Sequence, residues 1–187
     1  MAESSEPNVE SHIAKFIETY QTLCVSANER ILSRHNLPLK AVYPFAASLT
    51  IVDISDAKFW HVRLSGTQTC ECLGQDTTGG NAQCSFPKQE LALRTMLAHS
   101  MFDGPWGVRT NTRVFYDNGG NAMLDTISLP LLGEEGQRLV AHFAKVLVDV
   151  EHEVQQRPRA EKTELASYAF VDLGYGLPED ESLRISA

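Results

Sequence analysis

Three of the four cysteines lie near one another in the sequence, at Cys70, Cys72 and Cys84, and His99 follows them. Three thiolates and one imidazole could together bind a zinc ion. Structural zinc sites, however, favour pairs of cysteines with two to four residues between them, and a Cys-x-Cys pair without a second close pair departs from that spacing. The spacing therefore favours small buried thiols, and we expect no metal site.

Asp125 is the acidic residue most suggestive of a buried function. It alternates in phase with Met123, Ile127 and Leu129, so its carboxylate is expected on the same side of a strand as an apolar row. A carboxylate there is costly unless it is hydrogen-bonded, which makes it a possible anchor for a polar group of a ligand. Alternatively, Asp125 lies near the end of the strand or the alternation shifts before it.

The sequence offers little for catalysis. It contains no Gly-x-Ser-x-Gly, no His-Glu-x-x-His and no phosphate-binding Gly-x(4)-Gly-Lys-Ser/Thr motif. A small α+β fold could still hold an isomerase or cyclase site built from Asp125 with His61 or Tyr116. His61, however, is expected on the opposite face from Trp60, so we predict that the protein is not an enzyme and keep this site as an alternative.

Length and charge limit the protein class. The chain has 187 residues, 43% hydrophobic, and a net charge of −8, which is typical of one soluble domain with extensions. The negative charge and the lack of a basic tract disfavour nucleic-acid binding. No apolar run is long enough to cross a membrane and the N-terminus does not resemble an export signal, so we expect a cytoplasmic protein with reduced cysteines.

An amphipathic helix is predicted near the N-terminus, within residues 11–35 and after a polar segment of residues 1–10. Its apolar residues repeat every three or four positions from Ile13 to Ile31, Ser11 is a possible N-cap, and Pro38 follows its end. This apolar stripe could pack on its own domain or pair with a second subunit. The residues expected on such a dimer or partner surface are Ile13, Phe16, Ile17, Tyr20 and Leu23.

The remaining patterns predict an α+β domain over residues 37–154 with one antiparallel sheet. A further extended segment is expected within residues 155–187, a C-terminal extension that packs back on the domain. The predicted strands are Ser48–Ile54, Lys58–Leu64, Gly107–Tyr116, Ala122–Leu132, Gln137–Asp149 and Tyr168–Leu173, and the second long helix is Pro87–Phe102.

Four short motifs follow one another along the chain. They are Arg63–Thr67 (RLSGT), Cys72–Gly79 (CLGQDTTG), Leu129–Leu132 (LPLL) and Phe170–Pro178 (FVDLGYGLP). In sequence and in order they resemble the RLxGT, GxDLTG, LLLPL and FIDIGxGVP segments of a group of stand-alone bacterial PAS proteins. The resemblance implies a PAS-like fold with a five-stranded antiparallel sheet, helices on one face and a cavity between them. It also implies a sensory or regulatory role in two-component signalling.

The same resemblance raises the question of a haem or flavin cofactor. Haem-binding PAS domains can place a proximal histidine where His99 lies, but a single histidine on an amphipathic helix is more often a surface residue. Residues 80–86 (GNAQCSF) depart from the group's pattern, and they do not resemble the Asn-Cys-Arg-Phe-Leu-Gln cluster of flavin photoreceptors. We therefore expect neither haem nor flavin, and the ligand stays unassigned.

We expect a non-catalytic regulatory module that binds a small ligand, a partner protein or both. The N-terminal helix would be its homodimer contact or output surface, and a sensor kinase or response regulator its signalling partner. A ligand-free adaptor of two-component signalling is the alternative. The residues predicted to line the ligand pocket are Trp60, Val62, Leu64, Met96, Met123, Asp125, Ile127 and Leu129.

Overall fold

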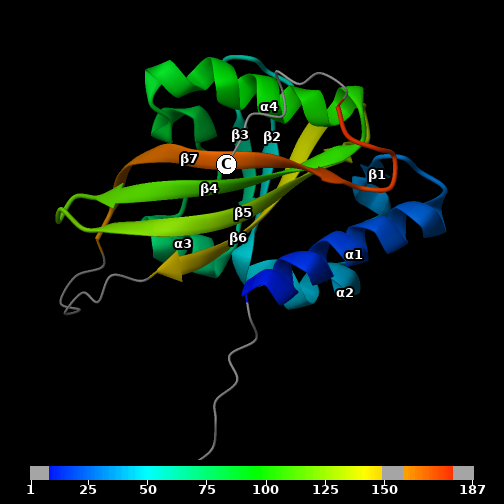
Figure 1. Ribbon diagram of the computed structural model, residues 1–187, viewed down its shortest axis with the longest axis horizontal. Helices are drawn as coiled ribbons and strands as arrows, with labels where there is room; N and C mark the ends of the chain where they lie inside the picture. Colours follow the sequence, from blue (N-terminus) through cyan, green and yellow to red (C-terminus); the bar gives the residue numbers. More distant parts are fainter. Residues whose placement is uncertain (1–8, 149–157, 179–187) are drawn as a thin grey trace, which may run out of the picture.

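The computed structural model describes residues 9–148 and 158–178, and Figure 1 shows its helices and strands. The predicted strand end at Asp149 and the outer parts of both terminal segments lie outside the described residues. The helices are α1 (Val9–Ala27), α2 (Leu39–Val42), α3 (Thr67–Leu73) and α4 (Leu91–Asp103), with short 3₁₀ turns at Arg34–Asn36, Tyr43–Ser48, Ala82–Ser85 and Lys88–Glu90. The strands are β1 (Leu32–Ser33), β2 (Leu49–Asp53), β3 (His61–Ser65), β4 (Trp106–Tyr116), β5 (Asn121–Leu132), β6 (Arg138–Val148) and β7 (Ala160–Asp172).

The strands form one sheet in the order β3-β2-β6-β5-β4-β7, in which every neighbouring pair is antiparallel. The first five strands of this order are the five-stranded sheet that the resemblance implied, so the predicted PAS-like α+β fold is confirmed. Two strands were not expected in the sheet. β1 pairs in parallel with β5, and β7 adds a sixth strand beside β4.

β7 is longer than the sequence predicted. Only Tyr168–Leu173 has the aromatic and β-branched composition of a strand, whereas the residues before it are mostly polar. The strand nevertheless begins at Ala160, because β4 offers it a hydrogen-bonding edge along its whole length. The pairing is interrupted by two register shifts, next to Asn111 and next to Tyr116. Tertiary pairing thus extends the strand beyond its local propensity.

α1 begins before the predicted N-cap Ser11 and ends four residues before Ile31. Asn28 has a positive φ of 55°, its N–H donates to Val25 O, and the N–H of Glu29 donates to Cys24 O. These two bonds form a Schellman C-cap, which ends the helix well before Pro38. The residues after the cap are therefore free to enter the sheet as β1.

The apolar stripe of α1 packs on the sheet of its own chain. Phe16 lies 5.0 Å from Phe45 and 5.2 Å from Phe143 between ring centroids, and all three side chains are buried. The Tyr20 hydroxyl donates to Pro130 O at 2.7 Å and accepts from Leu32 N–H at 3.2 Å. Of the five residues predicted for a dimer surface, Ile13, Phe16 and Tyr20 are buried here, and Ile17 and Leu23 are partly buried. A dimer through them would require α1 to leave the sheet.

α4 covers the opposite face of the sheet from α1 (Figure 1). Its buried residues Leu97 and Met101 pack with Val52, Val62 and Val108 of three strands. The sheet is therefore the middle of three layers, with one apolar core beneath α1 and a second beneath α4. Alternate residues of a strand therefore belong to different cores, and only one of these two sets can face a site beneath α4.

The Arg63–Thr67 motif makes a close backbone turn between β3 and α3. A Cβ atom on Gly66 would lie 2.4 Å from Ala46 O and 2.5 Å from Ala47 O, which no side chain allows. Gly66 N–H also donates to Leu49 O. Only glycine lets the chain pass this close to the turn before β2, and α3 is thereby placed over the edge of the sheet.

Candidate functional site

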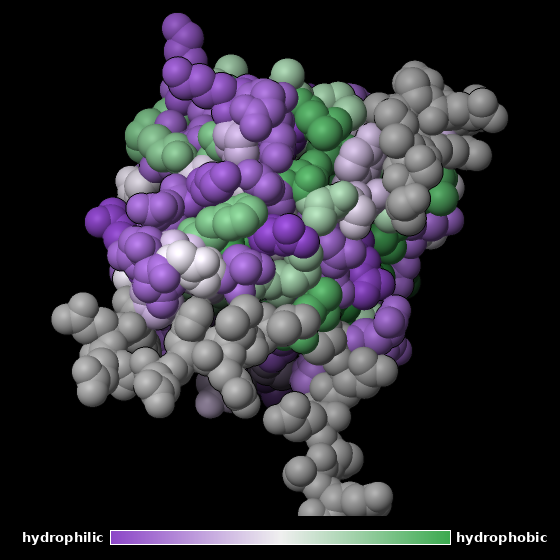
Figure 2. All heavy atoms as spheres, turned by 60° about the vertical axis from the view of Figure 1, so that its left-hand side comes forward, coloured by the Kyte–Doolittle hydropathy of each residue, from purple (hydrophilic) through white to green (hydrophobic). Residues whose placement is uncertain are grey.

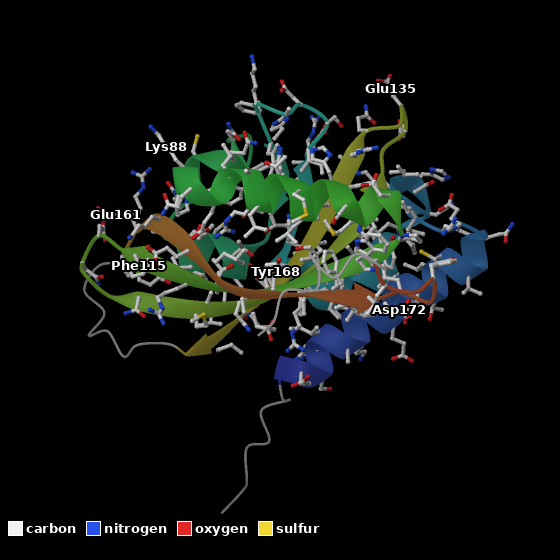
Figure 3. All side chains as sticks on the ribbon, turned by 45° about the horizontal axis from the view of Figure 1, so that its top comes forward. Lys88, Phe115, Glu135, Glu161, Tyr168 and Asp172 are labelled. Carbon is white, nitrogen blue, oxygen red and sulfur yellow. The ribbon has the colours of Figure 1, made fainter. Side chains whose placement is uncertain are left out.

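A cavity of about 620 Å³ lies between the sheet and the layer formed by α3, α4 and the segment that joins them. Val52, Val62 and Val108 line it from the sheet, and Leu97 and Met101 line it from α4. Figure 3 shows α4 lying over the sheet, with Tyr168 midway along β7. The volume and the mostly apolar walls are typical of a site for a small organic molecule.

Polar side chains line the floor of the cavity in cross-strand rows. In one row, Thr50, His142, Ser128 and Val108 lie side by side on β2, β6, β5 and β4. In the next row, Thr126 is paired directly with Thr110, and among the described residues neither of these two hydroxyls has a hydrogen-bond partner. Directly paired residues lie on the same face of a sheet, so these groups converge under α4.

His142 is the most perturbed titratable group on the cavity wall. Its Nδ1 atom is 2.8 Å from the Ser128 hydroxyl. Desolvation by the surrounding protein lowers its pKa to about 4, so the imidazole is neutral at physiological pH. A neutral imidazole beside a hydroxyl can donate and accept hydrogen bonds, which suits the recognition of an uncharged polar group.

One end of the cavity combines two aromatic rings with a cation. Trp60 meets Phe86 edge to face at 5.8 Å between centroids, and the Arg94 guanidinium carbon lies 4.6 Å from the centre of the Phe86 ring. Asn81 Oδ1 accepts the backbone N–H of Trp60 and so fixes the start of β3. The Trp60 indole N–H is buried and, in the described part of the chain, has no hydrogen-bond partner.

Arg94 is held by Glu90 one helical turn earlier. The Glu90 carboxylate accepts from Arg94 Nε at 2.9 Å and also accepts the backbone N–H of Leu165 on β7. Burial lowers the pKa of Arg94, while Glu90 opposes that shift. The residue therefore presents a largely desolvated cation to the cavity.

The cavity opens among charged side chains. Asp76, from the segment after α3, and three residues around the start of β7, Arg159, Glu161 and Lys162, line it and are exposed. Figure 3 shows Glu161 near the start of β7. On the face drawn in Figure 2, hydrophobic side chains lie in small groups between hydrophilic ones. Acidic and basic groups are thus mixed at the opening, whereas the interior holds only a cation and neutral groups.

Three of the eight predicted pocket residues, Trp60, Val62 and Met96, lie on the cavity side of the sheet, whereas Leu64 shares the other face with Ile51. Trp60 and Val62 line the cavity. Met96 packs against the core beneath α4 but is not part of the cavity wall. Leu64 is 43% exposed and pairs with Ile51, because a register shift between β2 and β3 ends the regular alternation with Val62.

The four residues predicted on β5 also face away from the cavity, and this prediction was wrong. Ile127 and Leu129 are buried in the core beneath α1, and Asp125 lies in phase with them. Met123, paired with Arg113 on β4, is also outside the cavity wall. The alternation along β5 was correct, but alternation alone does not indicate which face a cavity occupies. The neighbours of these residues, Leu124, Thr126 and Ser128, line it instead.

Asp125 is an ion-pair residue and not a ligand anchor of the cavity. Its carboxylate is 3% exposed and accepts two hydrogen bonds from Arg109, Nε to Oδ1 at 2.9 Å and Nη2 to Oδ2 at 2.6 Å. Arg109 Nη1 also lies 3.3 Å from Glu10 in the first turn of α1. The pair thus links β4 and β5 to the beginning of α1.

The residues considered for acid–base chemistry are not brought together. The Tyr116 hydroxyl lies 3.5 Å from Cys72 Sγ, on the opposite face of the sheet from Asp125. His61 packs against Phe59 on the edge strand β3, and β2 and β6 separate it from Asp125 on β5. His99, the possible haem ligand, lies 3.3 Å from Arg138 and outside the cavity wall. The combination proposed for an isomerase or cyclase is therefore not assembled.

The cysteines are also separated. Cys70 contacts Ser65 and Asp76, Cys84 lies at the cavity opening and is exposed, and none of the four cysteines forms a disulfide within the described residues. Among residues 9–148 and 158–178, no three histidine, cysteine or acidic side chains are grouped so that they could hold a metal ion. Within those same residues, no helix has both the length and the apolar character needed to cross a membrane.

Sequence reasoning missed His142, Ser128, Thr126 and Arg94. On β5 the polar side of the alternation contained the signal, because Thr126 and Ser128 lie two residues apart, whereas His142 on β6 stands alone among apolar residues. The Glu90–Arg94 spacing of four residues is typical of a helix pair and could also have been found.

No family model matches the chain, and no curated protein matches it. Solved structures with similar folds include a fungal LOV domain photoreceptor, at 16% identity, a TM-score of 0.43, and 55% of this chain and 75% of that one. A Rhodobacter sphaeroides LOV protein has 14% identity and a TM-score of 0.43 over 72% of this chain and 68% of that one. VqmA bound to DPO has 13% identity and a TM-score of 0.44 over 60% of this chain and 58% of that one.

LOV domains are a subfamily of PAS domains, and these matches agree with the fold described above. The chain spans a little over half the length of the VqmA chain. At these identities and TM-scores, the likeness carries no argument about ligand, cofactor or partner. The function must therefore be argued from the cavity and the contacts around it.

Proposed function

We propose that this protein is a non-catalytic regulatory module that binds a small molecule in the cavity between α4 and the sheet. The observation that carries the proposal is the cavity itself, about 620 Å³ with apolar walls and a polar floor. A closely packed interior leaves few voids larger than a water molecule, so a space of this size lined by converging polar groups is unusual without a ligand.

The polar floor supports binding of an organic molecule over a purely apolar one. The Thr110 and Thr126 hydroxyls lack partners among the described residues, and His142 with Ser128 completes a row of groups that can donate or accept. Both threonines are only partly buried, so water in the cavity can reach their hydroxyls, and a polar group of a ligand would replace that water. A bound ligand would supply these partners.

A route from the cavity to the surface supports a regulatory role. Thr110 and Thr126 line the cavity from β4 and β5, and the adjacent residues Arg109 and Asp125 form the ion pair on the other face. Arg109 also contacts Glu10 of α1. A ligand that favours one position of these strands would favour one state of α1 by the difference in its affinity for the two states.

A binding partner for the protein is proposed from the same change in α1. Release of α1 would expose Ile13, Phe16 and Tyr20, an apolar stripe that could join a second copy of the chain or bind a sensor kinase or response regulator. A cytoplasmic location suits such a partner. The acid, histidine and tyrosine considered for catalysis are not brought together, because β2 and β6 separate His61 from Asp125 and Tyr116 lies on the other face of the sheet, which supports regulation over catalysis.

Comparison of native and denaturing mass spectra of the full chain, together with its absorbance spectrum, tests the proposal. We expect a stoichiometric small molecule that is lost on denaturation. Thr126→Tyr, which fills the floor of the cavity, should abolish this mass difference. Thr22→Tyr, the same change on the exposed side of α1, should leave it intact. Haem or flavin would be identified directly by its absorbance.

An empty wild-type protein that also binds none of a screened set of metabolites would contradict the proposal. That result would favour the alternative function, a ligand-free adaptor that acts through a protein surface. Loss of the bound molecule in both threonine variants would also contradict it, since the binding site would then not be the cavity.

A further inference from the structure

We propose that the ligand of this cavity is a small organic acid whose carboxylate pairs with Arg94, with the Trp60 indole N–H as a second donor. The inference rests on the proposed function, since it assigns a chemical class to the molecule in the same cavity. It comes from the end of the cavity where Trp60 and Arg94 both contact the Phe86 ring.

Arg94 is the charged residue of the inner wall. Its side chain is 13% exposed, and its contacts are the Glu90 carboxylate and the face of Phe86. Nε and Nη2 both approach the same Glu90 oxygen, Oε2, at 2.9 and 2.8 Å, and Nη2 makes no hydrogen bond of good geometry. Glu90 additionally accepts the N–H of Leu165. A guanidinium has five N–H donors, so this single shared oxygen leaves donors for a second carboxylate.

Trp60 supplies an independent observation at the same end. The residue is 4% exposed, and its buried Nε1–H is without a hydrogen-bond partner in the part of the chain that the structure describes. Tryptophan offers a donor and no acceptor, so its partner must be an acceptor atom. A carboxylate oxygen or an adjacent carbonyl of the ligand would satisfy it.

The other walls limit the rest of the molecule. The apolar surfaces of the cavity come from Val62, Val108, Leu97 and Met101. The buried cation, Arg94, is already paired with Glu90, so it suits a ligand with a single negative charge better than a phosphate. The hydroxyls on the floor can receive one further polar group. The predicted ligand is therefore a monocarboxylate with an apolar body, and not a nucleotide or a sugar.

Matched pairs of an acid and its neutral amide test this assignment. Binding of 4-phenylbutyrate and of 4-phenylbutanamide to the full chain would be measured by titration calorimetry and by the change in tryptophan fluorescence. We expect the acid to bind at least tenfold more tightly than the amide. The preference should weaken as salt is added, since it depends on charge.

Three variants and one control locate the preference. Arg94→Gln should remove it, so that acid and amide bind alike, and Arg94→Lys should retain part of it. Trp60→Phe should weaken binding of the acid severalfold while the protein stays folded. Arg113→Gln removes one positive charge from an exposed position on β4 outside the cavity and should retain the full preference.

Equal binding of acid and amide to the wild type would overturn the inference and leave the proposed function standing. An undiminished preference in Arg94→Gln would also overturn it, because the anion would then bind elsewhere. Binding of neither compound overturns it as well. The proposed function is tested separately by the native and denaturing masses, so the two failures can be told apart.

Discussion

Arg109 and Asp125 form a two-bond ion pair across β4 and β5, and they do so on the face of the sheet that lies away from the cavity. The carboxylate is almost fully buried, whereas a third of the arginine side chain is exposed. The burial and the nearby carboxylates of Asp125 and Glu10 act in opposite directions on Arg109, and the hydrogen bonds prevail, so its pKa is raised. Burial of the Asp125 carboxylate therefore depends on its ion pair with Arg109.

Replacing Arg109 by leucine should destabilise the protein by about 3–5 kcal/mol, because it leaves a buried carboxylate without its partner. Urea denaturation at neutral pH measures this loss. Arg113→Ala, an exposed arginine on the same strand, should change stability by less than about 0.5 kcal/mol. The double variant Arg109→Leu with Asp125→Leu should recover part of the loss, and failure to recover any of it would contradict the buried-charge explanation.

Removal of the Tyr20 hydroxyl should cost about 1–3 kcal/mol, although Tyr20→Phe deletes only one atom. The hydroxyl joins α1 to Pro130 O of β5 and to Leu32 N–H of β1, and both backbone groups would lose their partner in a buried position. Burial raises the pKa of this phenol, so it stays protonated and able to donate. Equilibrium unfolding measures the loss, and Tyr43→Phe, at a residue that is 77% exposed, is the control.

Trp60→Ala should reduce the free energy of unfolding by about 3–5 kcal/mol, as truncation of a buried aromatic residue does. Trp60→Phe should cost clearly less, since a ring remains to pack against Phe86. Phe59→Ala, next to it but 44% exposed, is the matched control and should cost far less than Trp60→Ala. A melting temperature of Trp60→Ala equal to that of the wild type would mean that β3 does not bury this ring.

Stability should fall as the pH is lowered through the range between about 6.5 and 4, and His142 is one cause. Its folded pKa of about 4 lies below the ordinary value, so the unfolded chain takes up a proton in this range that the folded protein does not. The contribution is lost as the pH falls and amounts to at most about 3 kcal/mol. Unfolding measured at pH 7 and at pH 4.5 should therefore show a smaller loss for His142→Gln than for the wild type. Equal losses would show that the histidine is not desolvated.

Much of the fold followed from periodicity and composition. The strand pairs and α4 lie where alternation and helical spacing placed them, because those patterns record which side of each element is buried. The end of α1 was missed, since Asn28 stops the helix through its backbone conformation and not through an apolar break. The start of β7 was missed because the polar residues from Ala160 have low strand propensity and depend on β4 for their pairing.

The residues of the cavity were predictable only in part, because the sequence does not show which buried face of the sheet holds the cavity. A sheet covered on both faces gives each strand two buried sides, and the sequence does not record which helix covers which side. Ile127 and Leu129 were correctly expected to be buried, but they belong to the core under α1. Ser128 and His142, to which the sequence analysis gave no role, face the cavity. A residue of the α1 core can be told from a residue of the cavity wall only when α1 and α4 are known to cover opposite faces of the sheet.

The position of β7 at the end of the sheet has a consequence for solubility. Without this strand, β4 would present eleven residues of unpaired backbone to solvent, an edge on which another chain could assemble in a growing stack. β7 takes over that edge with two register shifts and with Glu161, Lys162 and Glu164, whose charges and irregular pairing make it a poor template. A chain that stops before Ala160 should therefore aggregate, so this last strand protects the sheet as well as closing one side of the cavity.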